Sequence, residues 1–242
     1  MKGLVMAAGR CTRLQDLSAK RNKVLLDLGG ETLLGNILNH FERAGLSESF
    51  VVLGFDAQAV RMVCHRRATC ILNPFYEHYG ILSSVWEARP HLEGSSFLFT
   101  TGDHYFSYPH LQAFLHDQPR ADVLVDVEIK PCDDEDMKVY INRSGKLRTI
   151  TKKVLSGTIL GEFTSLVRLS AEGSRQFFAT MEAQVRHQGI GGYVADVLCS
   201  YQRKWELAFH LCSDHGRVDV DFPCDLTKAR ELHGQQAPDE VA

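Results

Sequence analysis

The sequence lacks several features that would assign it to a familiar class. Its 242 residues contain no apolar run long enough to span a membrane and no long basic run, and the net charge is only −3. These absences argue against membrane insertion and against a nucleic-acid-binding surface. Polar Lys2 and Gly3 lead directly into the first apolar segment, which also argues against a signal peptide.

Cysteine motifs are also missing. The seven cysteines are odd in number and include no Cys-x-x-Cys pair, so a disulfide framework and a zinc site are poorly supported. We expect reduced, mostly buried thiols in a cytoplasmic protein. The Gly-x-Ser-x-Gly elbow of serine hydrolases is absent, and neither standard glycine-rich phosphate-binding pattern is complete. The sequence therefore offers no evident pair of a nucleophile and a base.

What is present is an apolar content of 44%, typical of folded proteins, arranged in short alternating segments. Apolar runs predict buried strands at 2–7, 50–54, 68–72, 96–101 and 121–128. Helical spacing predicts helices between them at 32–44, 57–65, 84–92 and 111–116. This alternation predicts an α/β fold of Rossmann-like, three-layer type with a mixed, mostly parallel sheet.

The pattern changes after Pro131. A hairpin is predicted around the turn at 143–145, and a β-rich excursion of the chain then returns to the sheet. Further strands are predicted at 162–169, 207–212 and 217–220, and further helices at 171–187, 192–203 and 226–232. No linker divides the chain, so we expect a single domain over 1–233, in two halves of about 1–130 and 131–233, with a flexible tail at 234–242.

The loop after the first strand is the first candidate site. Residues 7–13 read Ala-Ala-Gly-Arg-Cys-Thr-Arg, and Lys23 follows ten residues later. A buried strand that runs into a small basic loop directs backbone N–H groups and cations at one point, which is how proteins bind phosphate groups. The alternative is an ordinary tight turn between a strand and a helix.

Two acidic segments form the second candidate site. Asp103 follows the strand at 96–101, and ligands of open α/β sheets lie beyond the carboxyl ends of strands. Alternation of two valines places Asp219 and Asp221 on one face of a strand, where two acids need a cation. Mg²⁺ prefers oxygen ligands and keeps several waters, so Asp103 with Asp221 suffices, and Asp219 is the fallback ligand. The alternative for Asp103 is a helix N-cap, the role we expect for Asp225.

The order of motifs along the chain carries a resemblance. The motifs are the first loop with Lys23, Asn73-Pro-Phe-Tyr76, Ser83-Ser84-Val85, Gly102-Asp103-His104, Met137-Lys138-Val139, Gly161-Glu162-Phe163 and the acidic segment 218–226. Together they resemble MobA-like and sugar-phosphate nucleotidyltransferases, and most of all the cytidylyltransferases that act on phosphocholine, inositol phosphate or aminoethylphosphonate. Two positions depart from that pattern, because Cys11 replaces a glycine and Asn22 replaces a proline.

The resemblance implies a role for each matching residue. It implies that the half at about 1–130 binds the nucleotide, through Ala7, Ala8, Gly9, Arg10, Cys11, Thr12, Arg13, Lys23, Asn73, Ser83, Ser84 and Gly102. Arg13 would contact the β- and γ-phosphates and Lys23 the α-phosphate, so the implied catalytic residues are Arg13, Lys23 and Asp103. The half at about 131–233 would form a lid and bind the acceptor, together with His104, through Lys138, Lys152, Lys153, Glu162, Phe163 and Asp196. The alternative for the three lysines is a solvated hairpin face.

The implied activity is the Mg²⁺-dependent transfer of CMP from CTP to a small phosphorylated alcohol or phosphonate, with release of pyrophosphate. Such an acceptor is already an oxyanion, so positioning and charge neutralisation suffice. One alternative is a sugar-1-phosphate nucleotidyltransferase that uses UTP or another NTP. A second, suggested by Cys11 and Asn22, is a regulatory nucleotide-binding domain without turnover. A dinucleotide-dependent oxidoreductase is disfavoured. The acceptor, a homodimer and fusion to another enzyme domain are left open.

Overall fold

The structure of the chain is a computed structural model that describes residues 1–10, 21–213 and 216–235. The predicted contacts of Cys11, Thr12 and Arg13 lie outside the described residues, as does most of the predicted flexible tail. The six cysteines in the described part of the chain are free thiols. None of the described helices is both long enough and apolar enough to cross a membrane.

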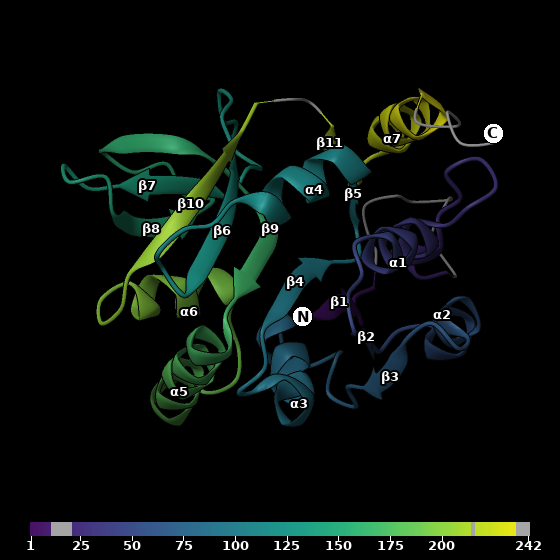
Figure 1. The fold of residues 1–242 in the computed structure, drawn as a ribbon, viewed down its shortest axis with the longest axis horizontal. Helices are drawn as coiled ribbons and strands as arrows, with labels where there is room; N and C mark the ends of the chain where they lie inside the picture. Colours follow the sequence, from purple (N-terminus) through teal and green to yellow (C-terminus); the bar gives the residue numbers. More distant parts are fainter. Residues whose placement is uncertain (11–20, 214–215, 236–242) are drawn as a thin grey trace.

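A mixed sheet forms the centre of the fold (Figure 1). Its main strands are β1 (Lys2–Ala7), β2 (Glu48–Leu53), β3 (Thr69–Leu72), β4 (Phe97–Thr101), β6 (Val123–Glu128), β9 (Thr158–Leu169) and β10 (Leu207–Cys212). Within the described residues they lie in the order β10-β6-β9-β4-β1-β2-β3, and a hairpin of β7 (Lys138–Ile141) and β8 (Leu147–Thr151) extends from β9. Along this row only β9 runs antiparallel to its neighbours, so the predicted mostly parallel sheet is confirmed.

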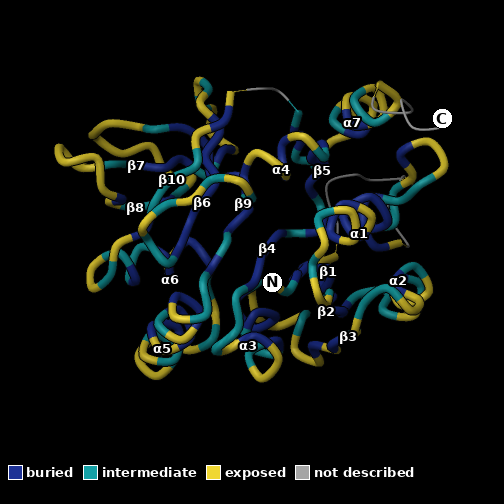
Figure 2. The backbone as a smooth tube through the Cα atoms, in the orientation of Figure 1, coloured by how far each residue is buried: buried dark blue, intermediate teal, exposed yellow. Residues whose placement is uncertain are grey.

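Helices cover both faces of the sheet. Leu4 and Met6 of β1 point into a core with α3 (Ile81–Leu92), α5 (Ala171–Gln188) and α6 (Val194–Tyr201). Val5 and Ala7 point the other way, into a core with α1 (Leu33–Arg43), α2 (Ala57–Cys64) and α4 (Tyr108–His116). Since successive side chains of a strand alternate between faces, one apolar strand serves both cores. The buried centre of the sheet separates the exposed outer faces of the helices in Figure 2.

A third, smaller core brings the end of the chain back to its beginning. Strands β5 (His104–Phe106) and β11 (Arg217–Asp219) form an antiparallel ribbon, followed by α7 (Pro223–Gln235). Leu226 of α7 lies in one apolar cluster with Leu28 and Leu33, and α7 lies beside α1 in Figure 1. The ribbon therefore sets the acidic segment after β11 against the residue that follows β4.

The elements follow the predicted order, with differences at their boundaries. Helix α3 begins at Ile81 rather than at 84, because Ser83 already donates its hydroxyl proton to the carbonyl of Gly80, closing the first turn. Strand β9 begins at Thr158 rather than at 162, and β5 was not predicted, since three residues are too few to show a period. The boundary between two halves near residue 130 stays a prediction.

Candidate active site

A lysine lies between two carboxylates where β1 and β4 end. Lys23 opens the short helix η2 (Lys23–Leu25), and its side chain is only 8% exposed. The ammonium lies 2.7 Å from Oδ1 of Asp221 and 3.2 Å from Oδ2 of Asp103. The structure thus brings together the three residues that the sequence predicted for the α-phosphate and the metal.

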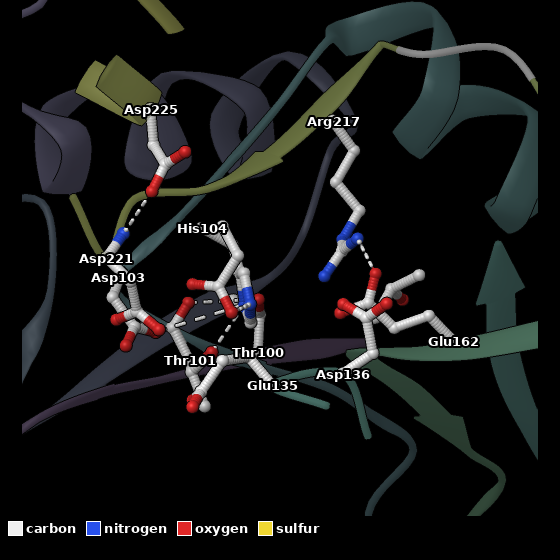
Figure 3. A network of polar contacts seen from close by, with 12 residues as sticks. Thr100, Thr101, Asp103, His104, Glu135, Asp136, Glu162, Arg217, Asp221 and Asp225 are labelled. Atoms are coloured by element: carbon white, nitrogen blue, oxygen red, sulfur yellow. Dashed lines mark hydrogen bonds and ion pairs between the residues drawn. The ribbon is translucent and has the colours of Figure 1, made fainter. Parts of the chain in front are cut away.

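A histidine and a third carboxylate complete this group. Nε2 of His104 lies 3.3 Å from Oδ2 of Asp219, and Nδ1 lies 2.5 Å from Oγ1 of Thr101. We call Lys23, Asp103, His104, Asp219 and Asp221 the aspartate cluster; of its members, Asp103, His104 and Asp221 are labelled in the left part of Figure 3. The carboxylate of Asp225 accepts hydrogen bonds from the backbone N–H groups of Asp221 and Phe222. Asp225 therefore lies inside the first turn of α7, not at the predicted N-cap.

The charges of the aspartate cluster stabilise one another. Burial alone would lower the pKa of Lys23, but the carboxylates of Asp103, Asp219 and Asp221 outweigh it and raise that pKa. Burial would raise the pKa of Asp219, but His104 and Lys23 hold it well below its usual range. The pKa of Asp103 is lowered in the same way, by Lys23 and His104. Asp103 and Asp219 are therefore kept ionised.

The aspartate cluster has spare capacity to bind a cation. Oδ1 of Asp103 and Oδ1 of Asp219 are buried and accept no hydrogen bond from any described residue. Ligand atoms of Asp103, His104 and Asp219 lie within 4.8 Å of one another. Because Mg²⁺ takes oxygen ligands and needs only one or two carboxylates beside a substrate phosphate, this donor set fits a divalent cation.

Two cavities meet at the aspartate cluster. The larger has a volume of about 360 Å³ and the smaller about 250 Å³. Asp103 and Asp221 line both of them, together with Ile81 and Thr101. A molecule in one cavity can therefore contact a molecule in the other next to these two carboxylates.

The larger cavity contains part of the predicted nucleotide site. Among the described residues predicted for the nucleotide, those on its wall are Gly9, Arg10, Lys23 and Ser84. The others are buried behind the wall: Ala7, Ala8, Asn73, Ser83 and Gly102. The amide of Asn73 donates to the hydroxyl groups of Ser83 and Ser84, so it positions the start of α3. The resemblance also implies that the turn from Gly80 to Ser83 lies by the base, and Gly80 and Ile81 line this wall; sequence reasoning did not assign Met6, Val24, Tyr76, Tyr79 or Thr101 to it.

Asn22, the departure from the proline of the pattern, has a structural role. Its side-chain amide donates to the carbonyls of Ala7 and Phe55 at 2.7 and 2.8 Å, and its Oδ1 accepts from the backbone N–H of Val24. A proline could make none of these side-chain bonds. Asn22 therefore anchors the backbone beside Lys23 to β1 by hydrogen bonds.

The smaller cavity contains fewer of the predicted acceptor residues. Lining it are His104, Lys152 and Phe163, together with Met137, Ser165 and Tyr193, which were not predicted. Lys138 is buried, and its ammonium donates to the backbone carbonyls of Asp136 and Lys152. The carboxylate of Asp196 accepts from the backbone N–H of Tyr193 at the start of α6.

A second group of charged residues contains Glu162 and accounts for its buried position. Nη1 of Arg217 lies 2.9 Å from Glu128 and 3.0 Å from Glu162, and the ammonium of Lys130 lies 3.0 Å from Glu162 and 3.1 Å from Asp136. We call these five residues the arginine cluster; Arg217, Glu162 and Asp136 are labelled at the right of Figure 3. Among the described residues that line the two cavities, there is no member of the arginine cluster. Glu162 thus joins β9 to β11, and its predicted contact with the acceptor stays a prediction.

Solved structures with the same fold include the CTP:phosphocholine cytidylyltransferase of Streptococcus pneumoniae, with a TM-score of 0.76 and 13% identity over 96% of this chain and 98% of that one. The inositol-1-phosphate CTP transferase of T. maritima has a TM-score of 0.77 and 17% identity over 100% and 97%. A putative glucose-1-phosphate thymidylyltransferase from Bacillus anthracis has a TM-score of 0.77 and 16% identity over 96% and 94%. At such identities these likenesses show the fold.

Sequence comparison supplies the family. The CMP-5'-(3-aminopropyl)phosphonate synthase of Streptomyces rubellomurinus is 26% identical over 259 residues, which cover 95% of this chain but only 38% of that protein. The model of the MobA-like NTP transferase domain matches residues 3–143, more than half of the chain. The chain therefore belongs to the MobA-like NTP transferase family, as its motifs indicated, and is a nucleotidyltransferase.

Proposed function

We propose that this nucleotidyltransferase is a Mg²⁺-dependent cytidylyltransferase that transfers CMP from CTP to a small phosphonate or phosphorylated alcohol. The observation that carries the proposal is the common wall of the two cavities, where Asp103 and Asp221 face both. A nucleotide in the larger cavity and an acceptor in the smaller one would bring their phosphorus centres together at these carboxylates. CTP is chosen because the curated relative forms a CMP derivative by its name, and two structural neighbours are named for CTP.

The proposed chemistry needs no general base. An oxyanion of the acceptor attacks the α-phosphorus of CTP, the bond from that phosphorus to the bridging oxygen breaks, and pyrophosphate leaves. The ammonium of Lys23 would orient the α-phosphate and neutralise its charge. Asp103 and Asp221, with Asp219 as a third donor, would hold the divalent cation, which supplies further neutralisation of phosphate charge when bound.

The shape of the smaller cavity favours a short acceptor. Its lining includes apolar residues, among them Ile81, Phe99 and Phe163, and also Asp103, His104, Asp219 and Asp221 of the aspartate cluster. An alkyl chain that ends in a phosphonate suits this lining, because the alkyl part can contact the apolar residues while the phosphonate lies at the cation site. A hexose would instead bring several hydroxyl groups against apolar walls, and hydroxyl groups buried without partners are destabilising. The product name of the curated relative contains such a short aminoalkyl phosphonate.

Pyrophosphate release tests the proposal. The protein is incubated with Mg²⁺, each NTP in turn, and a panel of aminoalkylphosphonates, phosphocholine, inositol phosphate and glucose 1-phosphate. We expect release with CTP and at least one phosphonate or phosphoalcohol. Release only with glucose 1-phosphate would contradict the proposal and identify a sugar-phosphate nucleotidyltransferase, an alternative kept because one structural neighbour is named for that substrate. Binding of CTP without release from any pair would indicate a regulatory domain.

A further inference from the structure

We propose that Lys23 occupies the cation site of the free protein and that the divalent cation binds only when substrate phosphate draws this ammonium away. The inference deepens the proposed function and rests on its assignment of Asp103 and Asp221 to the cation. It concerns a step before chemistry, namely how the site is loaded.

The first argument is that both cations need the same oxygen atoms. The ammonium of Lys23 lies 2.7 Å from Oδ1 of Asp221 and 3.2 Å from Oδ2 of Asp103, between the two carboxylates. A divalent cation held by both aspartates must come close to this position. Two cations at such short distance repel each other, and the repulsion is screened little at the lysine side chain, which is only 8% exposed. Occupancy by one therefore disfavours occupancy by the other.

The second argument is that the side chain of Lys23 can move while its backbone is held. The three hydrogen bonds of the Asn22 side chain, to Ala7, Phe55 and Val24, fix the chain at the base of Lys23. The lysine side chain itself is a flexible four-carbon stem that lines the larger cavity. A triphosphate in that cavity offers the ammonium new anionic partners, so the lysine can leave the carboxylates without losing charge compensation.

The third argument is that the remaining acceptors suit a cation with higher charge. Asp103 and Asp219 each retain a buried Oδ1 that accepts no hydrogen bond from the described residues. One ammonium with three protons does not satisfy this set, whereas a divalent cation takes six or more oxygen ligands. Lys23 is thus a partial substitute, sufficient to keep the empty site stable and weak enough to be displaced.

The consequence is coupled loading. The free protein should bind divalent cations weakly, and the nucleotide should raise that affinity. By linkage, the cation must raise the affinity for the nucleotide by the same factor. A cation would then be retained mainly in the presence of the substrate that it assists.

Binding of Mn²⁺ to nucleotide-free protein, followed by electron paramagnetic resonance, tests this directly. We compare wild type with Lys23→Met and Lys23→Gln, which both remove the charge. Each variant should bind one Mn²⁺ at least about tenfold more tightly than wild type, as expected when a unit charge leaves a site beside two carboxylates. Mg²⁺ should displace it, and adding Asp103→Asn to Lys23→Met should abolish the gain.

Lys152→Met is the matched control. Lys152 lines the smaller cavity, as Lys23 lines the larger one. In the described structure its ammonium pairs with Glu135 and makes no contact with the aspartates of the aspartate cluster. Its loss should change Mn²⁺ affinity by less than about twofold, since exposed charges are screened. An equal gain in Mn²⁺ affinity in Lys152→Met would show that only the net charge of the protein matters, and it would overturn the proposal.

Two other results would overturn it. One is an unchanged Mn²⁺ affinity in folded Lys23→Met or Lys23→Gln, with folding checked by circular dichroism. The other is stoichiometric binding of one Mn²⁺ by wild type without nucleotide, which needs no variant. Neither measurement contains CTP or an acceptor, so a failure here is distinct from the absence of cytidylyl transfer in the pyrophosphate assay.

Discussion

The aspartate cluster and the arginine cluster both combine acidic and basic side chains, but they differ in which hydrogen-bonding groups are left over. Within the described residues, the aspartate cluster has surplus acceptor oxygens, whereas the arginine cluster has surplus donor N–H groups. In the aspartate cluster the side chains of Asp103, Asp219 and Asp221 are 38%, 40% and 30% exposed, and two buried carboxylate oxygens accept no hydrogen bond from the described residues. In the arginine cluster the side chains of Arg217 and Glu162 are 6% and 7% exposed, and Nε and Nη2 of Arg217 find no acceptor in the part of the chain that the structure describes. Only surplus acceptors that open onto a cavity can take up a cation. A cation-binding site and an internal structural anchor therefore differ in two properties: whether acceptors or donors are in surplus, and whether these groups are exposed.

One strand supplies both clusters. Arg217 and Asp219 stand two residues apart and share a face of β11, and Asp221 follows just after the end of this strand. Arg217 fixes the strand to β6 and β9, and the two aspartates follow toward the cavities. We infer that the arginine cluster contributes to activity only by holding the strand, which the predictions below can contradict.

The largest expected effect is on turnover. Asp103→Asn should reduce kcat by about 10²- to 10³-fold, the usual result of removing one preorganised electrostatic group. The melting temperature should change little, because the amide keeps the shape of the side chain. The matched variant in the other cluster is Glu128→Gln, which should leave most of the turnover. Equal losses of turnover in the two folded variants would remove the distinction between site and anchor.

The next effect is on stability. Arg217→Met should lower the free energy of unfolding by about 3 to 5 kcal/mol, because it removes the buried cation that Glu128 and Glu162 share. Arg175→Met removes an arginine from an exposed pair with Glu172 and should cost less than about 1 kcal/mol. Urea unfolding measures both. A loss for Arg217→Met no greater than that for Arg175→Met would show that the arginine cluster does not anchor the strand.

A third effect depends on pH and acts on the ribbon that both clusters share. His40 is buried against the carbonyl of Phe106 in β5, and burial lowers its pKa to about 4. Because the unfolded chain binds this proton below about pH 6.5, stability should fall between pH 6.5 and 4, by up to about 3 kcal/mol. His40→Gln should remove this part of the slope of unfolding free energy against pH. The exposed His116→Gln should retain it; identical slopes in all three proteins would contradict the assignment.

The smallest effect concerns the cavity wall. A Cβ at Gly80 would lie 2.9 Å from the carbonyl oxygen of Gly192, so Gly80→Ala must displace the turn before α3. We expect KM for CTP to rise by about three- to tenfold, since a misfit of about 1 kcal/mol changes affinity several-fold. At Gly191 a Cβ would meet nothing within 4 Å, so Gly191→Ala is the control. Unchanged KM in Gly80→Ala would argue against nucleotide binding in the larger cavity.

The sequence predicted the parts of the site that follow from the geometry of parallel strands. Lys23 and Asp103 come after β1 and β4, and neighbouring parallel strands end at the same edge, so their proximity could be inferred. Glu162 and Lys138 lie on antiparallel strands, where the partner across the sheet decides what each side chain meets. Glu162 meets Arg217, 55 residues away, and no local pattern indicates that pair.

Asn22 is a second residue whose role could not be predicted from the sequence, because its partners are distant along the chain. As a replacement for proline it suggested a loss of function, yet its hydrogen bonds with Ala7, Phe55 and Val24 tie the start of the short helix η2 to β1 and to the segment after β2. These partners include a residue 33 positions away, which becomes a neighbour only in the folded sheet. The order of motifs thus predicts the fold and the reacting centre, while roles that depend on distant partners require the structure.

Phosphorus NMR of the reaction mixture tests the central claim most directly. Wild-type protein is mixed with CTP, Mg²⁺ and 3-aminopropylphosphonate or phosphocholine, and the Asp103→Asn variant is run beside it. The account predicts that signals of a new phosphonate–phosphate or phosphate–phosphate anhydride and of pyrophosphate grow together with wild type, and at least about a hundredfold more slowly with the variant. No anhydride with either acceptor, while glucose 1-phosphate supplied in their place yields a nucleotide sugar, would contradict the account, and so would equal rates for the two proteins.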